Sequence, residues 1–193
     1  AGGHARSCID VIESIKDYEV GGLVDNKLKG QEVLGYPIVG TDSDLRVLRE
    51  KFDLAFISLG QIKSSEPRKD LFKLLKKLNY KLPKLISPHS YISEYSMLSE
   101  GTILMHGVIV NSNVNIGTNC IVNSRCLIEH DCKIGHNCHL STGSIINGGV
   151  SIGDGTFVGS GSVIKNDIKI GKDCVVGAGL FIKEDLKEGS FIK

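Results

Sequence analysis

Tryptophan is absent from this 193-residue sequence, and aromatic residues make up only 6% of it. Any hydrophobic core must therefore be built mainly from aliphatic side chains. No apolar run approaches the ~18–20 residues that cross a bilayer, and no signal peptide is visible, so we expect a cytoplasmic protein. Lysine and arginine total 23 against 22 aspartate and glutamate. This balance predicts neither nucleic acid nor a membrane surface as a partner.

Both ends of the sequence look cut. It begins on a glycine turn, Ala1-Gly2-Gly3-His4, with no strand before it, and it stops at Lys193 without a terminating segment. We therefore expect a short strand before Ala1 and a short tail after Lys193 to be missing.

An unbroken period of six residues runs through the C-terminal half. From Ile86 to Ile182 every sixth residue is Ile, Leu or Val, a period that neither a helix nor a single strand produces. A second column, two residues earlier, carries mostly small or β-branched side chains. Glycine often follows the aliphatic residue, where we expect a turn to need a permissive backbone. The repeat predicts a left-handed parallel β-helix over residues 86–193, with three hexads in each coil.

Five of the six cysteines occupy the second column of this repeat. Their spacing of six residues, or a multiple of six, fits neither a zinc site nor a secreted disulfide framework. A free cysteine packs as a small hydrophobe, so we interpret this set as core residues, with metal or redox chemistry as the alternative. The set is Cys120, Cys126, Cys132, Cys138 and Cys174.

Residues 1–85 lack the six-residue period and alternate between helix and strand patterns instead. This alternation predicts a small Rossmann-like α/β domain with a parallel sheet, ending where the repeat begins at residue 86. The expected helices cover residues 5–16, 42–51 and 66–79, and the expected strands cover 19–24, 37–39 and 54–59.

The glycine turn at the start of the chain opens the first expected helix. Free backbone N–H groups there favour an anion such as a nucleotide phosphate. Asp25 ends the next strand, where an acidic side chain can take a ribose hydroxyl, and Gly60 ends the third. Because the glycine motif is incomplete, the alternative is a plain tight turn with Asp25 as a helix cap.

Stacking of the coils places several glycines in one column. Gly143, Gly161 and Gly179 follow one another at 18 residues, and Asn123 lies beside this column. Missing side chains let a ligand approach the backbone, and a long thin molecule such as pantetheine can lie along such an edge. The alternative is that turns simply favour glycine.

His130, followed by Asp131, is the candidate general base. Histidine accepts a proton near neutral pH, and a neighbouring carboxylate favours its charged form. One coil along, the backbone N–H of Gly148 can face a developing oxyanion, and His139 can help to hold a thioester carbonyl. We place this base at the head of the glycine column, which indicates acyl transfer. The alternatives are a surface histidine, or a metal site that also uses His136, although the spacing fits no standard metal site.

These features resemble the bacterial sialic-acid O-acetyltransferase and UDP-4-amino-sugar N-acetyltransferase family of the hexapeptide-repeat superfamily. The resemblance covers essentially the whole chain. Its motifs, in chain order, are Gly2-Gly3-His4, Val24-Asp25, Ser58-Leu59-Gly60 with Arg68, Glu129-His130-Asp131 and Cys138-His139.

The resemblance implies roles for the β-helix residues. His130 would be the base that deprotonates the acceptor, with Asp131 beside it. His139 would contact the acetyl group, Asn123 would lie near the active site, and Gly148 would donate to the thioester carbonyl.

It also implies how the substrates and the subunits are arranged. His4 and the turn Gly2-Gly3 would contact a nucleotide sugar, with Asp25 near the uridine. Acetyl-CoA would be the co-substrate without any metal, and a homotrimer would place its active sites between neighbouring β-helices.

We therefore expect an acetyl-CoA-dependent N-acetyltransferase acting on a UDP-4-amino-4,6-dideoxy sugar, in bacterial surface glycan or nonulosonic acid biosynthesis. The alternative within the family is a sialic-acid O-acetyltransferase, which shares base, groove and fold. An alternative of another class is a non-catalytic β-helix scaffold, which predicts no organised His–carboxylate pair beside a groove.

Overall fold

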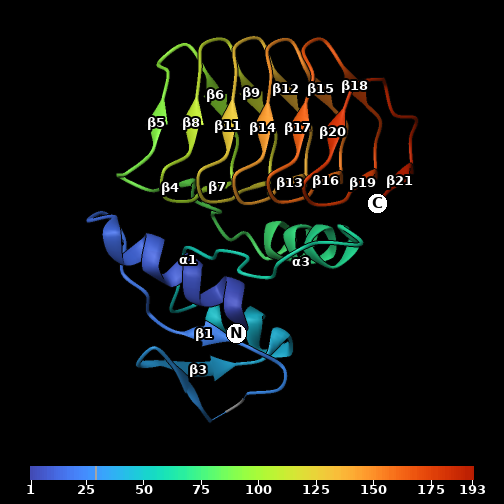
Figure 1. Ribbon diagram of the computed structural model, residues 1–193. Helices are drawn as coiled ribbons and strands as arrows, with labels where there is room; N and C mark the ends of the chain where they lie inside the picture. Colours follow the sequence, from blue (N-terminus) through green and yellow to red (C-terminus); the bar gives the residue numbers. More distant parts are fainter. Residues whose placement is uncertain (29) are drawn as a thin grey trace.

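The six-residue period becomes one strand and one turn per hexad in the computed structural model, which describes residues 1–28 and 30–193 (Figure 1). From the turn of Gly101 to the turn of Gly179, each turn contains a residue with positive φ, a conformation that glycine, asparagine and aspartate adopt at least cost. Within this range the sequence supplies these residue types at every corner but one, which carries Arg125. The corner residues are Gly101, Gly107, Asn113, Asn119, Arg125, Asp131, Asn137, Gly143, Gly149, Gly155, Gly161, Asp167, Asp173 and Gly179.

The glycines that follow the aliphatic residues have a different cause from the one expected. Gly117 and Gly135 do not have positive φ, so our turn explanation is wrong for them. A Cβ added at Gly117 would lie 2.6 Å from the Gly135 carbonyl oxygen of the next coil, and one added at Gly135 would lie 2.7 Å from Asp154 N. These positions need glycine because consecutive coils approach too closely there for a side chain.

The strands form three parallel sheets, one for each face of the β-helix. The first sheet contains β4 (Leu85–Ile86), β7 (Ile103–Leu104), β10 (Ile121–Val122), β13 (His139–Leu140), β16 (Phe157–Val158), β19 (Val175–Val176) and β21 (Phe191–Ile192). The second contains β5 (Tyr91–Ile92), β8 (Ile109–Val110), β11 (Leu127–Ile128), β14 (Ile145–Ile146), β17 (Val163–Ile164) and β20 (Phe181–Ile182). The third contains β6 (Met97–Leu98), β9 (Asn115–Ile116), β12 (Lys133–Ile134), β15 (Ser151–Ile152) and β18 (Lys169–Ile170).

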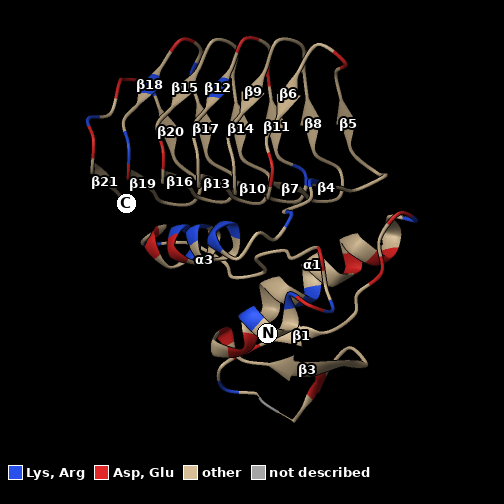
Figure 2. Ribbon diagram, turned by 180° about the vertical axis from the view of Figure 1, so that it is seen from behind, with Lys and Arg blue, Asp and Glu red and all other residues tan. Residues whose placement is uncertain are grey.

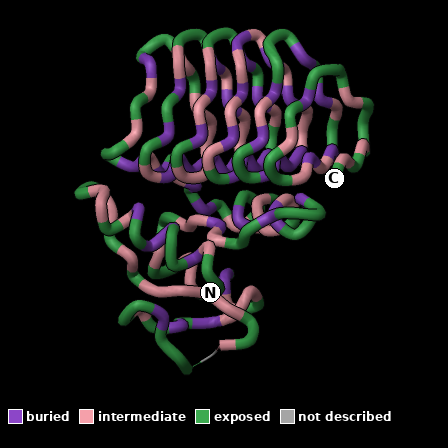
Figure 3. Tube along the Cα trace, in the orientation of Figure 1, coloured by how far each residue is buried: buried purple, intermediate pink, exposed green. Residues whose placement is uncertain are grey.

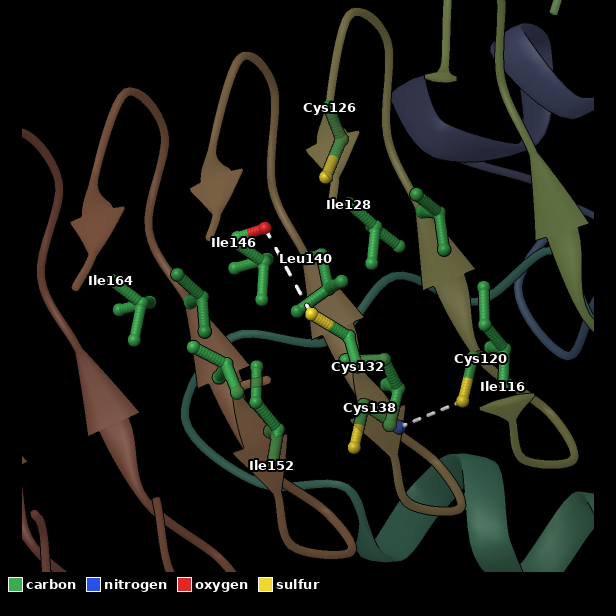
Figure 4. Close-up of a cluster of buried hydrophobic side chains, with 14 of the residues drawn as sticks. Ile116, Cys120, Cys126, Ile128, Cys132, Cys138, Leu140, Ile146, Ile152 and Ile164 are labelled. Carbon is green, nitrogen blue, oxygen red and sulfur yellow. Dashed lines mark hydrogen bonds between the residues drawn. The ribbon is translucent and has the colours of Figure 1, made fainter. Parts of the chain in front are cut away.

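Aliphatic and sulfur-containing side chains fill the interior of the β-helix. Figure 4 shows Ile128, Ile146 and Ile164 stacked coil upon coil, with cysteines packed between such columns. The five cysteines of the repeat are fully buried, which confirms their interpretation as core residues. Burial raises the pKa of the Cys126 thiol to about 12, so that this thiol stays protonated.

The N-terminal unit lies against the first sheet (Figure 1). Its β1 pairs in parallel with β3, and β2 forms an antiparallel hairpin with β3 that the sequence analysis did not predict. The elements are α1 (Gly3–Ser14), β1 (Leu23–Val24), β2 (Glu32–Val33), β3 (Tyr36–Gly40), the 3-10 turn η1 (Asp42–Asp44), α2 (Leu45–Leu48) and α3 (Glu66–Lys77).

One strand expected from the sequence is missing from this unit. In residues 54–59 the only ladder contact within the described chain is a bridge from Leu54 to Lys81. The strand prediction is therefore wrong for the described chain. A strand needs a hydrogen-bonded neighbour, and this segment instead lines a cavity of ≈ 840 Å³ that residues 20–24 also line.

The outward side chains differ sharply among the three sheets. Those of the first sheet are covered by the N-terminal unit from β4 to β16, where Leu85, Ile103 and Ile121 pack with Cys8 and Val11 of α1. Those of the third sheet are mostly polar and include two lysines on β12 and β18, which are blue in Figure 2. Those of the second sheet are all apolar and are not covered by any other described element. They are Tyr91, Ile109, Leu127, Ile145, Val163 and Phe181.

Figure 3 shows how burial follows this arrangement, with buried segments inside the β-helix and along the side that faces the N-terminal unit. No helix among the described residues is long and apolar enough to cross a membrane.

Candidate active site

His130 lies in the turn that joins β11 to β12, between the second and third sheets. Its Nδ1 is 2.7 Å from Asp131 Oδ2, and Asn113 Nδ2 donates to Asp131 Oδ1 over 2.6 Å. Hydrogen bonds from Asn113 and then from His130 lower the pKa of Asp131, so this carboxylate is ionised and can only accept. Nδ1 therefore carries the proton of the neutral imidazole, and Nε2 is free to accept one.

Gly148 lies directly beside His130 on the next coil, as the repeat predicts. A Cβ at Gly148 would lie 2.7 Å from His130 Cε1, so only glycine leaves room for the imidazole. The neighbouring amide of Gly149 donates to the His130 carbonyl over 2.9 Å. Within the described part of the chain, the Gly148 amide has no backbone acceptor. A base and an unpaired backbone donor thus stand side by side.

Replacing Gly148 by alanine should lower kcat of acetyl transfer by about 10–100-fold, because the added methyl group pushes the imidazole away from its position. Asn166→Ala is the matched control, since Asn166 lies on the same edge one coil further along. Steady-state kinetics at saturating acetyl-CoA make the comparison. Equal effects of the two substitutions would show that contact between Gly148 and His130 is not the cause.

The carboxylates around His130 set the pH dependence of a reaction that needs its neutral form. The hydrogen bond to Asp131 raises the pKa of His130 above its usual value, and the charges of Asp131, Glu129 and Asp167 act in the same direction. We expect kcat/KM to fall as the pH drops through this raised pKa. Asp131→Asn removes one negative charge, which lowers the pKa of His130 and should move the acid limb to lower pH. Asp154→Asn, near a different turn, should leave the limb in place, and an unmoved limb in Asp131→Asn would refute the assignment.

His139 lies on the opposite side of the β-helix, in β13 of the first sheet. It is buried against the N-terminal unit, with Nδ1 2.5 Å from the Gln61 carbonyl oxygen and Nε2 3.5 Å from Asn123 Nδ2. The ring of Phe157 packs edge-on, with its centroid 5.2 Å away. Burial, together with the charge of Arg68, lowers the pKa of His139 to about 4 and leaves the imidazole neutral.

His4 joins His139 at the start of α1. The two ring centroids are 6.4 Å apart, and His4 Nε2 is 3.5 Å from Cys8 Sγ. Burial, and secondarily the charges of Arg68 and His139, lower the pKa of His4 to about 4. A Cβ added at Gly60 would lie 3.5 Å from His4 Cβ. His4, expected to bind the nucleotide sugar, and His139, expected to bind acetyl-CoA, thus form one cluster with Gly60.

The glycine edge, defined as Gly143, Gly161 and Gly179, lies in turns between the first and second sheets. All three have positive φ, from 65° to 70°, so the turn explains why glycine is present. A side chain added at any of them would meet no atom within 4 Å, so the space beside the backbone is open. Both explanations of these glycines therefore hold: the turns require positive φ, and the backbone beside them is open to a ligand.

Within one chain, His130 does not stand at the head of the glycine edge. Six residues advance the chain by one corner, and the turn of His130 follows β11 whereas the turn of Gly143 follows β13. The turns between the second and third sheets lie on the far side of the β-helix from the N-terminal unit (Figure 1). Our single-chain arrangement of base and groove is therefore wrong, because the two features occupy different corners of the prism.

The nucleotide-binding candidates lie around the large cavity of the N-terminal unit. Gly2 and Gly3 line it at the start of α1, and Asp25 and Gly60 line its rim. Asp25 Oδ1 accepts from the amides of Lys27 at 2.8 Å and Leu28 at 3.2 Å. These bonds close a turn after β1, and no described helix begins there, so the alternative role of Asp25 as a helix cap is wrong.

Arg68 and Gln61 fasten the N-terminal unit to the β-helix. The buried Arg68 guanidinium donates to the Leu59 carbonyl at 2.6 Å and to Asn119 Oδ1 at 2.7 Å. Gln61 Nε2 donates to the Asn137 carbonyl at 2.9 Å. Gln61 and Asn113 were not predicted, since Gln61 contacts residues more than seventy positions away and Asn113 resembles an ordinary turn residue. No cluster of His, Cys, Asp or Glu suited to a metal ion occurs in residues 1–28 or 30–193.

Comparison with known proteins agrees with this architecture. Residues 1–74 match the PglD N-terminal domain, and residues 149–184 match the bacterial transferase hexapeptide repeat. No curated protein sequence matches the chain. The match to both families, with the three sheets, confirms a small α/β domain followed by a left-handed parallel β-helix and places the chain in the class of hexapeptide-repeat transferases.

Solved structures narrow the class. Perosamine N-acetyltransferase from Caulobacter crescentus, solved with CoA and GDP-perosamine, is 32% identical with a TM-score of 0.92, over 98% of this chain and 89% of that one. The acetyltransferase domain of PglB from Neisseria gonorrhoeae is 25% identical with a TM-score of 0.92, over 99% and 92%. WeeI from Acinetobacter baumannii, 24% identical with a TM-score of 0.90 over the same shares, shows a common fold. The chain belongs to the UDP-4-amino-sugar N-acetyltransferase family.

Proposed function

We propose that this protein transfers the acetyl group of acetyl-CoA to the amine of a nucleotide-linked 4-amino sugar. The observation that carries the proposal is the pairing of His130, whose Nε2 is free, with the unpaired amide of Gly148. The pairing occurs in a chain that is 32% identical, over 98% of its length, to an N-acetyltransferase solved with CoA and GDP-perosamine.

The chemistry is a direct transfer. The amine attacks the thioester carbonyl carbon while His130 Nε2 takes the amine proton, and the Gly148 N–H stabilises the oxyanion. The C–S bond then breaks, an amide forms, and the departing thiolate takes the proton back from His130. A covalent cysteine intermediate is not required, and all six cysteines are buried.

The two units take different parts in the reaction. We assign the nucleotide sugar to residues 1–85, through Gly2, Gly3, His4, Asp25 and Gly60, and the acetyl transfer to residues 86–193. Because acetyl-CoA is supplied in the cytoplasm, we place the reaction there, where its product serves the synthesis of a surface glycan or a nonulosonic acid. For the nucleotide base, the sequence resemblance favours uridine, whereas the Caulobacter relative was solved with a guanosine-linked sugar.

We further propose that the active protein is a homotrimer. The apolar column of the second sheet has no partner among the described elements of the chain, and a threefold axis facing this sheet would bury it in all copies. The glycine edge borders the second sheet on one side, and the His130 edge, defined as the turns between the second and third sheets, borders it on the other. Around such an axis the glycine edge of one copy therefore meets the His130 edge of the next. Acetyl-CoA on the glycine edge and the neighbour's base would then complete one site.

A thiol-release assay with acetyl-CoA tests the function. UDP- and GDP-linked 4-amino sugars form one arm of the panel, and free and CMP-linked sialic acid form the other. We expect thiol release with an amino sugar, and mass spectrometry should locate the acetyl group on nitrogen. Release only with a sialic acid would establish the O-acetyltransferase alternative instead, and no release with any acceptor would favour a scaffold.

A further inference from the structure

Arg125 occupies a turn where the coils before and after it have glycine. It lies between β10 and β11, at the same corner of the β-helix as the glycine edge and one coil before it. Its φ is 59°, a left-handed conformation that costs an arginine free energy and a glycine almost none. The neighbouring turns carry Gly107 and Gly143 at this position. The arginine destabilises its own turn, so the reason for its presence lies outside the turn.

The charge of Arg125 is not used within the described chain. The residue is exposed, and among residues 1–28 and 30–193 its guanidinium forms no hydrogen bond or ion pair. The side chain lies over the preceding coil, since a Cβ added at Gly107 would be 3.4 Å from Arg125 Cγ. A Cβ added at Gly143 would meet no atom within 4 Å, so Arg125 leaves the glycine edge open. It is a free cation beside the edge to which we assign acetyl-CoA.

Glu129 carries the opposite charge at the other end of the same strand. It follows β11 and precedes His130, and its Oε2 accepts a hydrogen bond from Asn111 Nδ2 over 2.7 Å. Within the described chain its Oε1 has no partner, so this carboxylate can still accept from a cation. Midway between Arg125 and Glu129 is Leu127, which belongs to the outward apolar column of the second sheet. One strand of the proposed interface is thus flanked by a cation and an anion.

The other described strands of the second sheet lack this pair of opposite charges. The equivalent residues, two before and two after the outward apolar residue, are His89 and Ser93, Gly107 and Asn111, Gly143 and Asn147, Gly161 and Lys165, and Gly179 and Lys183. A threefold axis parallel to the β-helix places equal coils of neighbouring copies side by side. The glycine edge of one copy then meets the His130 edge of the next, so Arg125 faces Glu129 of the neighbouring copy.

Building on the proposed homotrimer and its shared active site, we propose that Arg125 of each copy forms an ion pair with Glu129 of the neighbouring copy. Three such pairs surround the Leu127 side chains and fix the register of the copies along the axis, because a slip by one coil leaves both charges without a partner. Since Glu129 precedes His130, the pair also holds the base level with the start of the glycine edge. Arg125 is a positioning residue that acts through Glu129.

Charge reversal tests the pair, with association measured by analytical ultracentrifugation over a dilution series. Arg125→Glu should raise the concentration at which trimers dissociate by about tenfold or more, because carboxylates then face each other at three places. Adding Glu129→Arg should bring this concentration back to within about threefold of the wild type, since the pair is restored in reverse. Lys133→Glu, a charge reversal on the third sheet of the same coil, is the control and should have no effect.

Arg125→Gly removes the cation without endangering the fold, because glycine is the residue of the neighbouring turns. Its readout is the acid limb of kcat/KM, measured at a protein concentration that keeps the variant trimeric. Loss of the cation favours the protonated imidazole of His130, so the limb should move to higher pH, opposite to the shift in Asp131→Asn. The titratable and charged groups around this imidazole are Asp131, Glu129 and Asp167 of its own copy, with Arg125 and His106 on the facing turns of the neighbouring copy.

A trimeric wild type whose association is unchanged by Arg125→Glu would overturn the pair and leave the homotrimer standing. So would a double variant that associates no better than Arg125→Glu alone. An unmoved acid limb in Arg125→Gly would overturn the positioning role. A monomeric wild type would contradict the homotrimer and the pair together. Because sedimentation needs neither substrate nor activity, a protein without acetyl transfer would contradict the proposed function while the association data still decide the pair.

Discussion

His130→Ala should lower kcat/KM by about 10²–10⁴-fold, the contribution usual for a positioned general base. The neutral Nε2 is the only part of this residue that the reaction needs, since Asp131 occupies Nδ1. The affinity for acetyl-CoA should change little, because in our proposal the glycine edge, rather than His130, holds the pantetheine. Steady-state kinetics with varied acceptor, and direct binding of acetyl-CoA, separate the two effects.

His136→Ala provides the control for this result. His136 lies in the turn between the third and first sheets, and its Nδ1 is 3.0 Å from the Thr118 amide. It therefore occupies a corner that takes part neither in the glycine edge nor in the His130 edge. A loss of activity as large as that of His130→Ala would show that the assignment of corners, or of the base, is wrong.

Ile145→Glu should convert the trimer to monomers and lower kcat/KM by about 100-fold or more. Ile145 lies in the apolar column of the second sheet, where the proposed trimer would bury a carboxylate without a partner. Its side chain points out of the β-helix, so the chain should still fold. Light scattering and circular dichroism measure assembly and fold separately.

Ser151→Glu, on the neighbouring third sheet, is the matched control. It should remain trimeric and active, because that face stays in solvent in our arrangement. Ile145→Glu that remains trimeric, or wild-type protein that is monomeric at micromolar concentration, would contradict the homotrimer.

The β-helix was predictable because its rule is local. An aliphatic residue at every sixth position and small residues such as Cys126 two places earlier specify the coils without any long-range information. Neighbours one coil apart follow by counting, which is how Gly148 was placed beside His130. The reason for glycine at position 117 was not predictable, since close approach of the coils and a positive φ both select glycine.

The N-terminal unit and the grouping of site residues were harder, because they depend on tertiary pairing. The apolar segment 54–59 reads as a strand, yet strand formation requires a neighbour that a sequence pattern does not identify. His139 and His130 are only nine positions apart, and counting hexads places them on different faces, but the partner that fixes His139 is the carbonyl of Gln61. A backbone acceptor leaves no signature in the residue types.

A subunit-mixing experiment tests the central claim, acetyl transfer at a site shared by two copies. His130→Ala removes the base, and Thr142→Trp fills the glycine edge from an exposed turn position. Each variant alone should be inactive in the amino-sugar assay. Refolding them together in equal amounts should restore about one quarter of the wild-type activity, the fraction of interfaces that pair an intact base with an intact edge. Two inactive variants that remain inactive after mixing would contradict the shared site, since base and edge would then have to come from one chain.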